Sequence, residues 1–234
     1  MLYRDESRQE HTGATEENQV QSIARFVERG VKPDIWWIDA GWYPCGGQWI
    51  MTGTWRPDPE RFPRGLRPIG EQCEREGVQL LLWFEPERPD PDSEIGREHP
   101  EWVLTFPENG GDCPVRLVNL ADRECCDWHI ERIDALIRES KVHIYREDYN
   151  GNPEPYWVHH EAENRIGAME NFHAQGHLRL WDTLIERNPG LWIDSCAAGG
   201  KRNDLETMRR AVPLHYTDVG YGIHPVKQIG RAHV

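Results

Sequence analysis

Apolar runs alternate with helical patterns along the chain. Five runs are continuously apolar and predict buried strands at 34–39 (DIWWID), 78–84 (VQLLLWF), 142–145 (VHIY), 191–193 (LWI) and 212–216 (VPLHY). The segments between them repeat apolar residues with the helical period and predict helices at 16–29, 122–140, 165–187 and 205–210. The segment 58–66 reads as a loop that leads into a helix. Because the strands are apolar throughout, they predict a parallel sheet covered by helices.

Each predicted strand ends at or just before an acidic residue. These acids are Asp39, Glu85, Glu87, Asp148, Asp194 and Asp218. In a (β/α)₈ barrel the catalytic groups lie at the carboxyl ends of several strands, around one central bowl. A doubly wound dinucleotide-binding sheet needs a GxGxxG loop, which follows none of these runs. The pattern therefore predicts a (β/α)₈ TIM-type barrel, with about five of the eight strand–helix units present.

Composition narrows the class of protein. The 234 residues are 38% hydrophobic, which suits one large domain or two small ones. The formal net charge of -13 argues against a nucleic-acid surface. No apolar run is long enough to span a membrane, and residues 1–18 lack the apolar stretch of a signal peptide. We therefore expect a cytoplasmic protein with no nucleic-acid or membrane partner.

The six cysteines show neither a CxxC pair nor the spacing of zinc ligands with histidine. They lie at Cys45, Cys73, Cys113, Cys125, Cys126 and Cys196. We expect reduced thiols, no bound metal and no cofactor.

Eleven tryptophans accompany the carboxylates. Their flat apolar rings can bind the C–H faces of a sugar, although such rings also fill cores. Glycoside hydrolysis uses two carboxylates, about 5–5.5 Å apart in retaining enzymes and about 6.5–9.5 Å apart in inverting ones. The same carboxylates could instead hold a hard cation for metal-assisted hydrolysis. The residue pattern favours the sugar enzyme and leaves the metal enzyme open.

Six segments resemble, in order and approximate spacing, those of the glycoside hydrolase family 36 α-galactosidases. They are WWIDAGWY (36–43), LLLWFEPER (80–88), HPEW (99–102), YREDYN (145–150), DSCAAGGKRNDLET (194–207) and HYTD (215–218). The resemblance covers nearly the whole chain. It implies a retaining enzyme with a (β/α)₈ catalytic barrel that acts on α-galactoside oligosaccharides.

The resemblance also implies roles for particular residues. It makes Asp148 the nucleophile and Asp218 the general acid/base of a double displacement. Arg146 stands where the family has lysine, and we expect it to lower the pKa of Asp148 and to bind a sugar hydroxyl. Asn150 is expected to bind the sugar ring or the nucleophile. The other matches imply substrate-binding roles for Asp39, Trp83, Cys196 and Gly199.

Two residues depart from the family pattern. Ala40 replaces the second acid of the family's DDGW segment, which removes one acceptor for a sugar hydroxyl and leaves the preferred sugar open. Glu147 replaces an aromatic residue beside the nucleophile. Because side chains alternate along a strand, we expect Glu147 to point away from the bowl and to pair with a cation of a neighbouring helix.

We expect residues 1–228 to form part of the catalytic barrel of a longer protein. The tail 229–234 (IGRAHV) matches the translation of a common sequencing adapter, so we expect it to be non-native. Two alternatives stay open: an α-glycosidase or transglycosylase with another sugar preference on the same scaffold, and a non-catalytic carbohydrate-binding fragment. The sequence also leaves open whether the complete protein is a homo-oligomer.

Overall fold

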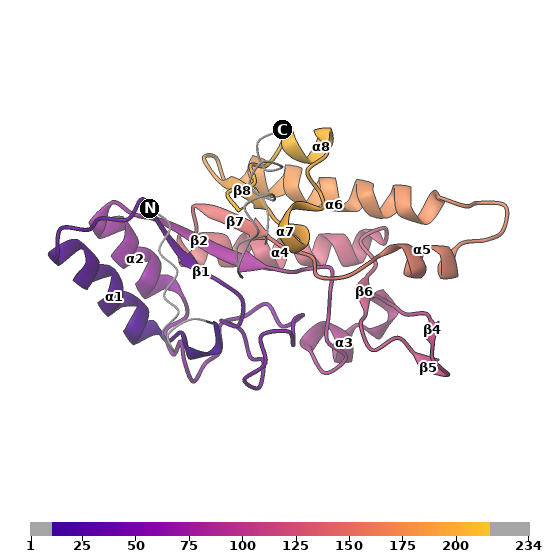
Figure 1. Ribbon diagram of the computed structural model, residues 1–234, viewed down its shortest axis with the longest axis horizontal. Coiled ribbons are helices and arrows are strands. Elements are labelled where there is room, and N and C mark those ends of the chain that lie inside the picture. Colours follow the sequence, from indigo (N-terminus) through magenta and orange to yellow (C-terminus); the bar gives the residue numbers. More distant parts are fainter. Residues whose placement is uncertain (1–10, 216–234) are drawn as a thin grey trace, which may run out of the picture.

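A four-stranded parallel sheet is the centre of the fold (Figure 1). The computed structural model describes residues 11–215. The strands are ordered β1-β2-β7-β8 across the sheet, with bounds β1 (Ile35–Ile38), β2 (Gln79–Phe84), β7 (Ile144–Glu147) and β8 (Trp192–Ser195). Four of the five predicted strands are therefore confirmed. The fifth begins as a single parallel bridge between Val212 and Asp194, and its last predicted residue lies outside the described range.

The predicted helices are confirmed with shifted ends. They are α1 (Glu16–Glu28), α4 (Arg123–Ser140), α6 (Ala168–Arg187) and α8 (Leu205–Met208). The expected helix after residue 66 is α2 (Arg67–Glu76), which ends at Gly77 in the left-handed conformation. Asp122 caps α4 and Asp204 caps α8, since each side chain accepts backbone N–H groups of the first turn. These two acids are therefore helix caps.

The long helices form one layer along the sheet. Helix α1 packs on α2, α2 on α4, and α4 on α6, in the same order as the strands that they accompany (Figure 1). Gly70 of α2 permits one of these contacts, because a Cβ there would lie 2.1 Å from the carbonyl oxygen of Ser140. The alternating pattern of the sequence thus gives a parallel sheet with its helices packed side by side.

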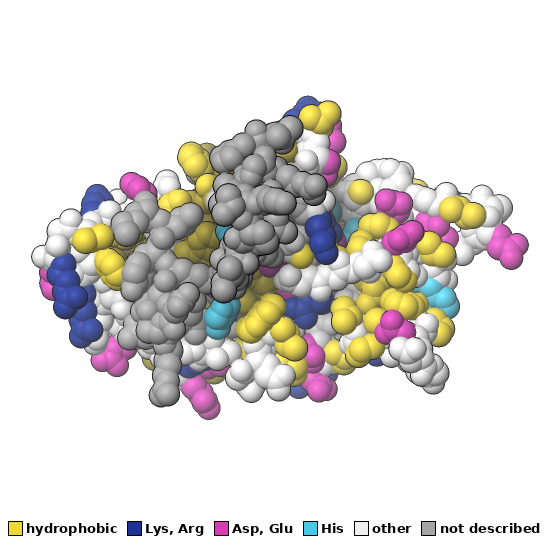
Figure 2. All heavy atoms as spheres, viewed as in Figure 1, with side chains coloured by type: hydrophobic (Ala, Val, Ile, Leu, Met, Phe, Trp, Pro, Cys, Tyr) yellow, Lys and Arg dark blue, Asp and Glu magenta, His cyan; other side chains and the backbone are white. Residues whose placement is uncertain are grey.

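Short elements that the sequence pattern did not predict connect the main units. They are the 3₁₀ helices η1 (His11–Gly13) and η2 (Pro100–Trp102), the helices α3 (Glu94–Glu98), α5 (Glu154–His160) and α7 (Ala197–Gly200), and two antiparallel pairs, β3 (Val103–Leu104) with β6 (Leu117–Val118) and β4 (Pro107–Glu108) with β5 (Gly111–Asp112). Two-residue strands are too short to carry a hydrophobic period, so no pattern revealed them. Figure 2 shows many hydrophobic side chains over the part of the molecule that holds α3, α5 and β4–β6 in Figure 1.

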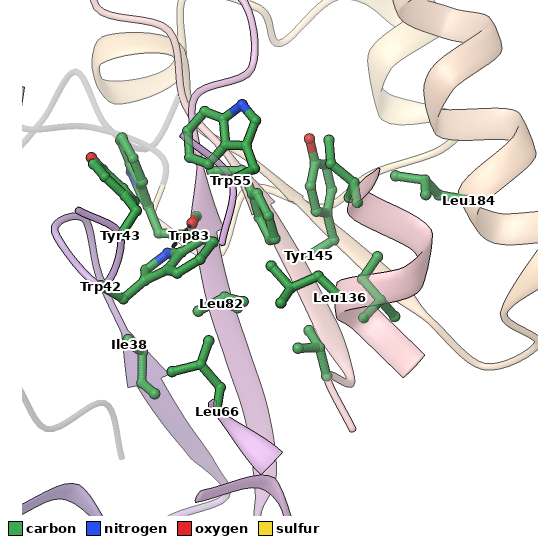
Figure 3. Close-up of a cluster of buried hydrophobic side chains, with 14 of the residues drawn as sticks. Ile38, Trp42, Tyr43, Trp55, Leu66, Leu82, Trp83, Leu136, Tyr145 and Leu184 are labelled. Carbon is green, nitrogen blue, oxygen red and sulfur yellow. Dashed lines mark hydrogen bonds between the residues drawn. The ribbon is translucent and has the colours of Figure 1, made fainter. Parts of the chain in front are cut away.

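The two faces of the sheet differ in chemistry. Ile38, Leu82 and Tyr145 belong to the main core cluster, together with Leu136 of α4 and Leu184 of α6 (Figure 3). Side chains of Trp83, Arg146 and Asp194 occupy the other face, since these residues are register partners on adjacent parallel strands. The helix-facing side is therefore largely apolar, and the opposite side carries charges.

Several tryptophans are core residues. Trp42, Trp55 and Trp83 are at most 2% exposed, and Figure 3 shows them grouped with Tyr43 at one end of the sheet. The indole of Trp42 donates to the backbone carbonyl of Trp83 at 2.8 Å. The first two of these tryptophans therefore stabilise the fold instead of forming an open floor for a ligand.

All six cysteines fall within the described range, where they are buried and free of disulfides. Among the helices of residues 11–215, none combines the length and the apolar character needed to cross a bilayer. The predictions for Asp218 and for the tail 229–234 lie outside the described residues.

Candidate active site

The carboxyl ends of β2, β7 and β8 bring together most of the predicted site residues. Asp148 directly follows β7. Trp83, near the end of β2, directs its indole N–H toward the Asp148 carboxylate at 3.4 Å. Parallel strands end at the same edge of a sheet, and the side chains at that edge can therefore act on one molecule.

The Asp148 carboxylate receives hydrogen bonds on both oxygens. The backbone N–H groups of Tyr149 and Ala198 donate to Oδ1 at 2.8 and 2.9 Å. The side-chain amide of Asn150 donates to Oδ2 at 3.0 Å. Asn150 thus reaches the candidate nucleophile, one of its two expected partners.

These donors keep Asp148 ionised. Burial by itself would raise the pKa of Asp148, but the Ala198 N–H, the Asn150 amide and the positive charge of Arg146 together lower this pKa below its ordinary value. The expected influence of Arg146 on Asp148 is therefore present, although two hydrogen bonds contribute more.

Arg146 is itself held by a partner that the sequence pattern did not assign to it. Its Nη1 donates to Asp194 Oδ2, and its guanidinium lies 4.4 Å from the ring centroid of Trp37. Burial raises the pKa of Asp194, although the neighbouring Arg146 opposes this shift. Asp194 also accepts the backbone N–H of Leu214 at 2.8 Å. Asp194 therefore orients Arg146 and anchors the chain that follows the Val212 bridge.

A turn after β8 carries the two predicted substrate-binding residues Cys196 and Gly199. Ala197 and Ala198 within it adopt left-handed φ angles of 56° and 48°, as does Gly199 at 77°. For residues with a side chain this conformation costs about 1–2 kcal/mol each. Burial raises the pKa of the Cys196 thiol to about 12. Because of these left-handed φ angles the turn is strained, and in this conformation the Ala198 N–H points at Asp148.

Asp39 approaches this group from the end of β1, and its charge contributes to the raised pKa of Arg146, after burial, which opposes the shift, and Asp194. It follows β1, and its Oδ1 accepts the backbone N–H of Ala40 at 2.8 Å. Its side chain is 27% exposed. Within residues 11–215 no hydrogen bond joins Asp39 to Asp148, so a ligand that reaches both carboxylates would be needed for a common role.

Glu85 fixes the chain just after the nucleophile. It pairs with Arg88 through both oxygens, at 2.7 and 2.5 Å, and accepts the Asn150 backbone N–H at 2.5 Å. Burial raises the pKa of Glu85, although Arg88 opposes the shift. Sequence reasoning identified Glu85 only as a strand-end acid, and the structure shows that it supports residue 150.

Glu147 points to the helix layer, as the alternation along β7 predicted. It accepts Tyr145 Oη at 2.5 Å and Trp181 Nε1 at 2.8 Å, and His177 Nε2 lies 2.5 Å away. The partners that α6 provides are thus the imidazole of His177, at ion-pair distance, and the indole of Trp181. Arg202 Nη1 lies 3.8 Å from the same carboxylate, but it comes from the segment after α7.

A buried ionic cluster surrounds Glu147 and was not predicted. The donor atoms of Glu87, Glu147 and His177 lie within 4.8 Å of one another, a spacing that could suit a metal ion. Arg202, however, donates to both oxygens of Glu87, and His173 Nε2 lies 2.7 Å from Glu87 Oε2. Burial would raise the pKa of Glu87, but Arg202 and His173 lower it well below its ordinary value. The polar residues 173 and 177, four apart on the buried face of α6, were the available signal in the sequence.

Two adjacent histidines, His159 and His160, end helix α5. His160 Nε2 lies 2.8 Å from the carbonyl oxygen of Thr105, and both side chains are exposed.

Comparison with known proteins finds relatives over most of the chain. A family model described as Melibiase matches residues 13–227. The α-galactosidase of Escherichia coli is 32% identical over 196 residues, which cover 82% of this chain and 26% of that protein. α-Galactosidase AgaA of Geobacillus stearothermophilus is 28% identical over 234 residues, which cover 93% of this chain and 32% of that protein. The chain thus spans about a quarter to a third of the length of these relatives.

Solved structures share the fold. A variant of AgaA in complex with raffinose superposes with a TM-score of 0.75 at 24% identity, over 90% of this chain and 29% of that one. The α-galactosidase of Lactobacillus brevis gives a TM-score of 0.75 at 22% identity, over 87% of this chain and 28% of that one. Identities this low establish the common fold and nothing further.

Proposed function

Since this chain belongs to the Melibiase family, we propose that the protein of which it forms a part is a retaining α-galactosidase. It would remove terminal α-linked galactose from oligosaccharides or other glycosides. The observation that carries the proposal is the Asp148 carboxylate, which lies at the end of β7 and is kept ionised by the Ala198 N–H and the Asn150 amide. A retaining mechanism requires such an ionised nucleophile.

The reaction would proceed in two displacements. In the first, Asp148 attacks the anomeric carbon while Asp218 gives a proton to the departing glycosidic oxygen, which leaves as an alcohol. In the second, Asp218 removes a proton from water, the water oxygen attacks the anomeric carbon, and the ester bond to Asp148 breaks. Arg146 and Trp83, on the same face of the sheet as Asp148, would contact the sugar.

We further propose that the sheet is part of a closed (β/α)₈ barrel. Three features support closure: all four strands are parallel, the helices α1, α2, α4 and α6 form one continuous layer, and a fifth parallel segment begins at Val212. Within residues 11–215, β1 has a strand neighbour on one side only. The charged face that carries Arg146 and Asp194 would then line the interior at the carboxyl ends of the strands.

The substrate class follows from the relatives only by analogy. AgaA variants have been solved with raffinose and with stachyose, both α-galactoside oligosaccharides. Ala40 favours a second candidate, a related α-glycosidase or transglycosylase with another sugar preference. The end of β1 carries Asp39 beside a buried alanine, so one carboxylate is available there for a sugar hydroxyl.

The test uses the complete protein with p-nitrophenyl α-galactoside, and compares Asp148→Ala with the surface variant Asp127→Ala. Asp148→Ala should lose nearly all activity, and added azide should restore turnover with β-galactosyl azide as the product. Azide would then attack from the face that Asp148 normally occupies. Asp127→Ala should keep wild-type activity, because Asp127 lies on α4 and is 45% exposed.

Two results would contradict the proposal. Full activity in Asp148→Ala would remove Asp148 as the nucleophile, and an α-configured azide would assign it to acid/base catalysis. Sugar binding without turnover in the wild-type protein would support the non-catalytic alternative. A parallel panel of aryl α-glycosides separates α-galactosidase from the other sugar preferences.

A further inference from the structure

A cluster of charged and polar side chains lies behind the candidate nucleophile, on the helix side of β7. We name it the Arg202 cluster and define it by Glu87, Glu147, His173, His177 and Arg202. Both glutamates are at most 2% exposed, and the two histidine side chains are 3% and 9% exposed. Each carboxylate has an imidazole nitrogen within 2.7 Å. The carboxylates and imidazoles of the cluster are therefore buried, the Arg202 side chain at its edge is 23% exposed, and His173 Nδ1 has no hydrogen-bond partner among the described residues.

Arg202 supplies the cation of this cluster. Its Nη2 donates to Glu87 Oε2 at 2.9 Å, and its Nη1 donates to Glu87 Oε1. Nη1 also lies 3.8 Å from Glu147 Oε1 and 3.5 Å from His177 Nε2. A metal ion bound by Glu87, Glu147 and His177 would have to displace this guanidinium, since both would use the same oxygens. In this structure the carboxylates of the cluster therefore bind Arg202.

Arg202 also connects the cluster to the nucleophile. It follows α7, and Ala198 in α7 donates its N–H to Asp148 Oδ1. Its guanidinium lies 4.9 Å from the ring centroid of Tyr149, and Tyr149 and Glu147 are the two chain neighbours of Asp148. One side chain thus joins the ends of β2 and β7 to the turn after β8.

The turn needs such an anchor because its backbone is strained. Ala197 and Ala198 hold left-handed φ angles that residues with a Cβ adopt only where the surroundings enforce them. Without the bonds from Arg202 to Glu87, the turn could relax to ordinary φ angles and withdraw the Ala198 N–H. Asp148 would then lose the hydrogen bond that contributes most to its lowered pKa.

We propose that Arg202 is a positioning residue that holds the Ala198 N–H on the nucleophile Asp148. The inference rests on the proposed function for its catalytic consequence. Its structural consequence, a fixed turn at 196–200, is independent of any activity. A distinct readout therefore exists for each.

The kinetic test compares Arg202→Met with Arg202→Lys and with the control Arg210→Met. Arg210 also forms ion pairs, with Asp182 and Glu206, but away from the cluster. Arg202→Met should lower kcat by about 100-fold with KM nearly unchanged, as misplacement of a reacting group by about 1 Å does. The acid limb of the kcat/KM profile should move to higher pH, because Asp148 loses a donor. Arg202→Lys should recover part of kcat, and Arg210→Met should match the wild type.

A suppressor sharpens the test. Glycine adopts left-handed φ angles without strain, so Ala198→Gly should let the turn keep its shape without the anchor. The double variant Ala198→Gly with Arg202→Met should therefore regain much of the kcat lost in Arg202→Met. Unchanged kcat and an unchanged acid limb in Arg202→Met would overturn the proposal.

A thiol readout works whether or not the protein is an α-galactosidase. Cys196 lies in the same turn and is 3% exposed, and Cys73 in α2 is 0% exposed. In Arg202→Met, alkylation mapped by mass spectrometry should accelerate at Cys196 and stay slow at Cys73. Slow alkylation at both would overturn the proposal. Equally fast alkylation at both thiols would indicate loss of the fold. The same measurement is then made on Arg202→Lys, in which alkylation should accelerate at Cys196 alone. Slow alkylation of Cys196 in Arg202→Lys would again overturn the proposal.

Discussion

Gly176 lies on α6, the helix that holds His173 and His177 in the Arg202 cluster, and it tests how much the close packing of α6 contributes to stability. A Cβ added at Gly176 would lie 1.9 Å from the carbonyl oxygen of Leu120 and 2.7 Å from its carbonyl carbon. The backbone oxygen of Gly176 accepts the Cys126 thiol at 3.4 Å. The perturbation Gly176→Ala therefore pushes two backbones apart at the place where α6 contacts the start of α4.

The magnitude follows from these distances. A carbon and a carbonyl oxygen approach no closer than about 3.3 Å, so the backbones must separate by roughly 1 Å or more. Overpacking of this kind costs about 1–3 kcal/mol, and the clash with a backbone atom places Gly176→Ala at the upper end. Alanine regains about 1 kcal/mol of helix propensity. We expect a net loss of about 2 kcal/mol in the free energy of unfolding.

Urea denaturation followed by tryptophan fluorescence measures this loss. The control is Gly111→Ala, since a Cβ at Gly111 meets no atom within 4 Å and its backbone is not left-handed. The control should change the free energy of unfolding by no more than about 0.5 kcal/mol. Equal stability of the two variants would refute the reasoning, because the close approach of α6 to Leu120 would then carry no energetic weight.

Two further predictions concern carboxylates whose pKa is lowered. Asn150→Ala removes the donor at 3.0 Å from Asp148 Oδ2, so the pKa of Asp148 should rise. The acid limb of the kcat/KM profile should then shift to higher pH. A pH profile identical to that of the wild type would contradict this prediction. Asp204→Ala removes the cap of α8, where the carboxylate accepts the N–H groups of Glu206 and Thr207, and should cost about 1 kcal/mol of stability at neutral pH. Burial would raise the pKa of Asp204, but the hydrogen bonds from Thr207 and Glu206 lower it. The stability that Asp204 contributes is therefore fully present above the ordinary aspartate pKa and is lost as the pH falls through the lowered pKa. A difference between wild type and Asp204→Ala that persists in urea titrations at low pH would count against this account.

Local patterns predicted the parts of the fold that depend on local physics. Apolar runs identified β1, β2, β7 and β8, although β7 and β8 end in the charged residues Arg146, Glu147 and Asp194. The twofold alternation along β7 placed Asp148 and Glu147 on opposite faces, because successive side chains of a strand point in opposite directions. Asp122 and Asp204 cap α4 and α8, a role that depends only on the adjacent backbone.

Partners far apart in the chain could not be predicted in the same way. Arg202 binds Glu87 across 115 positions, and Arg146 binds Asp194 across 48. Many arginines and glutamates in this acidic chain could have formed such pairs, and only the packing of α6 and the turn after β8 selects among them. The sequence pattern for the same reason could not separate Trp42 and Trp55, which fill the core, from Trp83, which also reaches Asp148.

Resemblance to the family thus indicated the candidate nucleophile Asp148, and the amino-acid pattern by itself determined the order of strands and helices along the chain and the face on which each strand residue lies. These depend on the period of the backbone, which is the same in every protein. The tertiary structure alone decided what surrounds Asp148: a strained turn that supplies an N–H from Ala198, and an Arg202 cluster that holds that turn. These depend on which distant segments meet, and that is set by how the helix layer packs on the sheet.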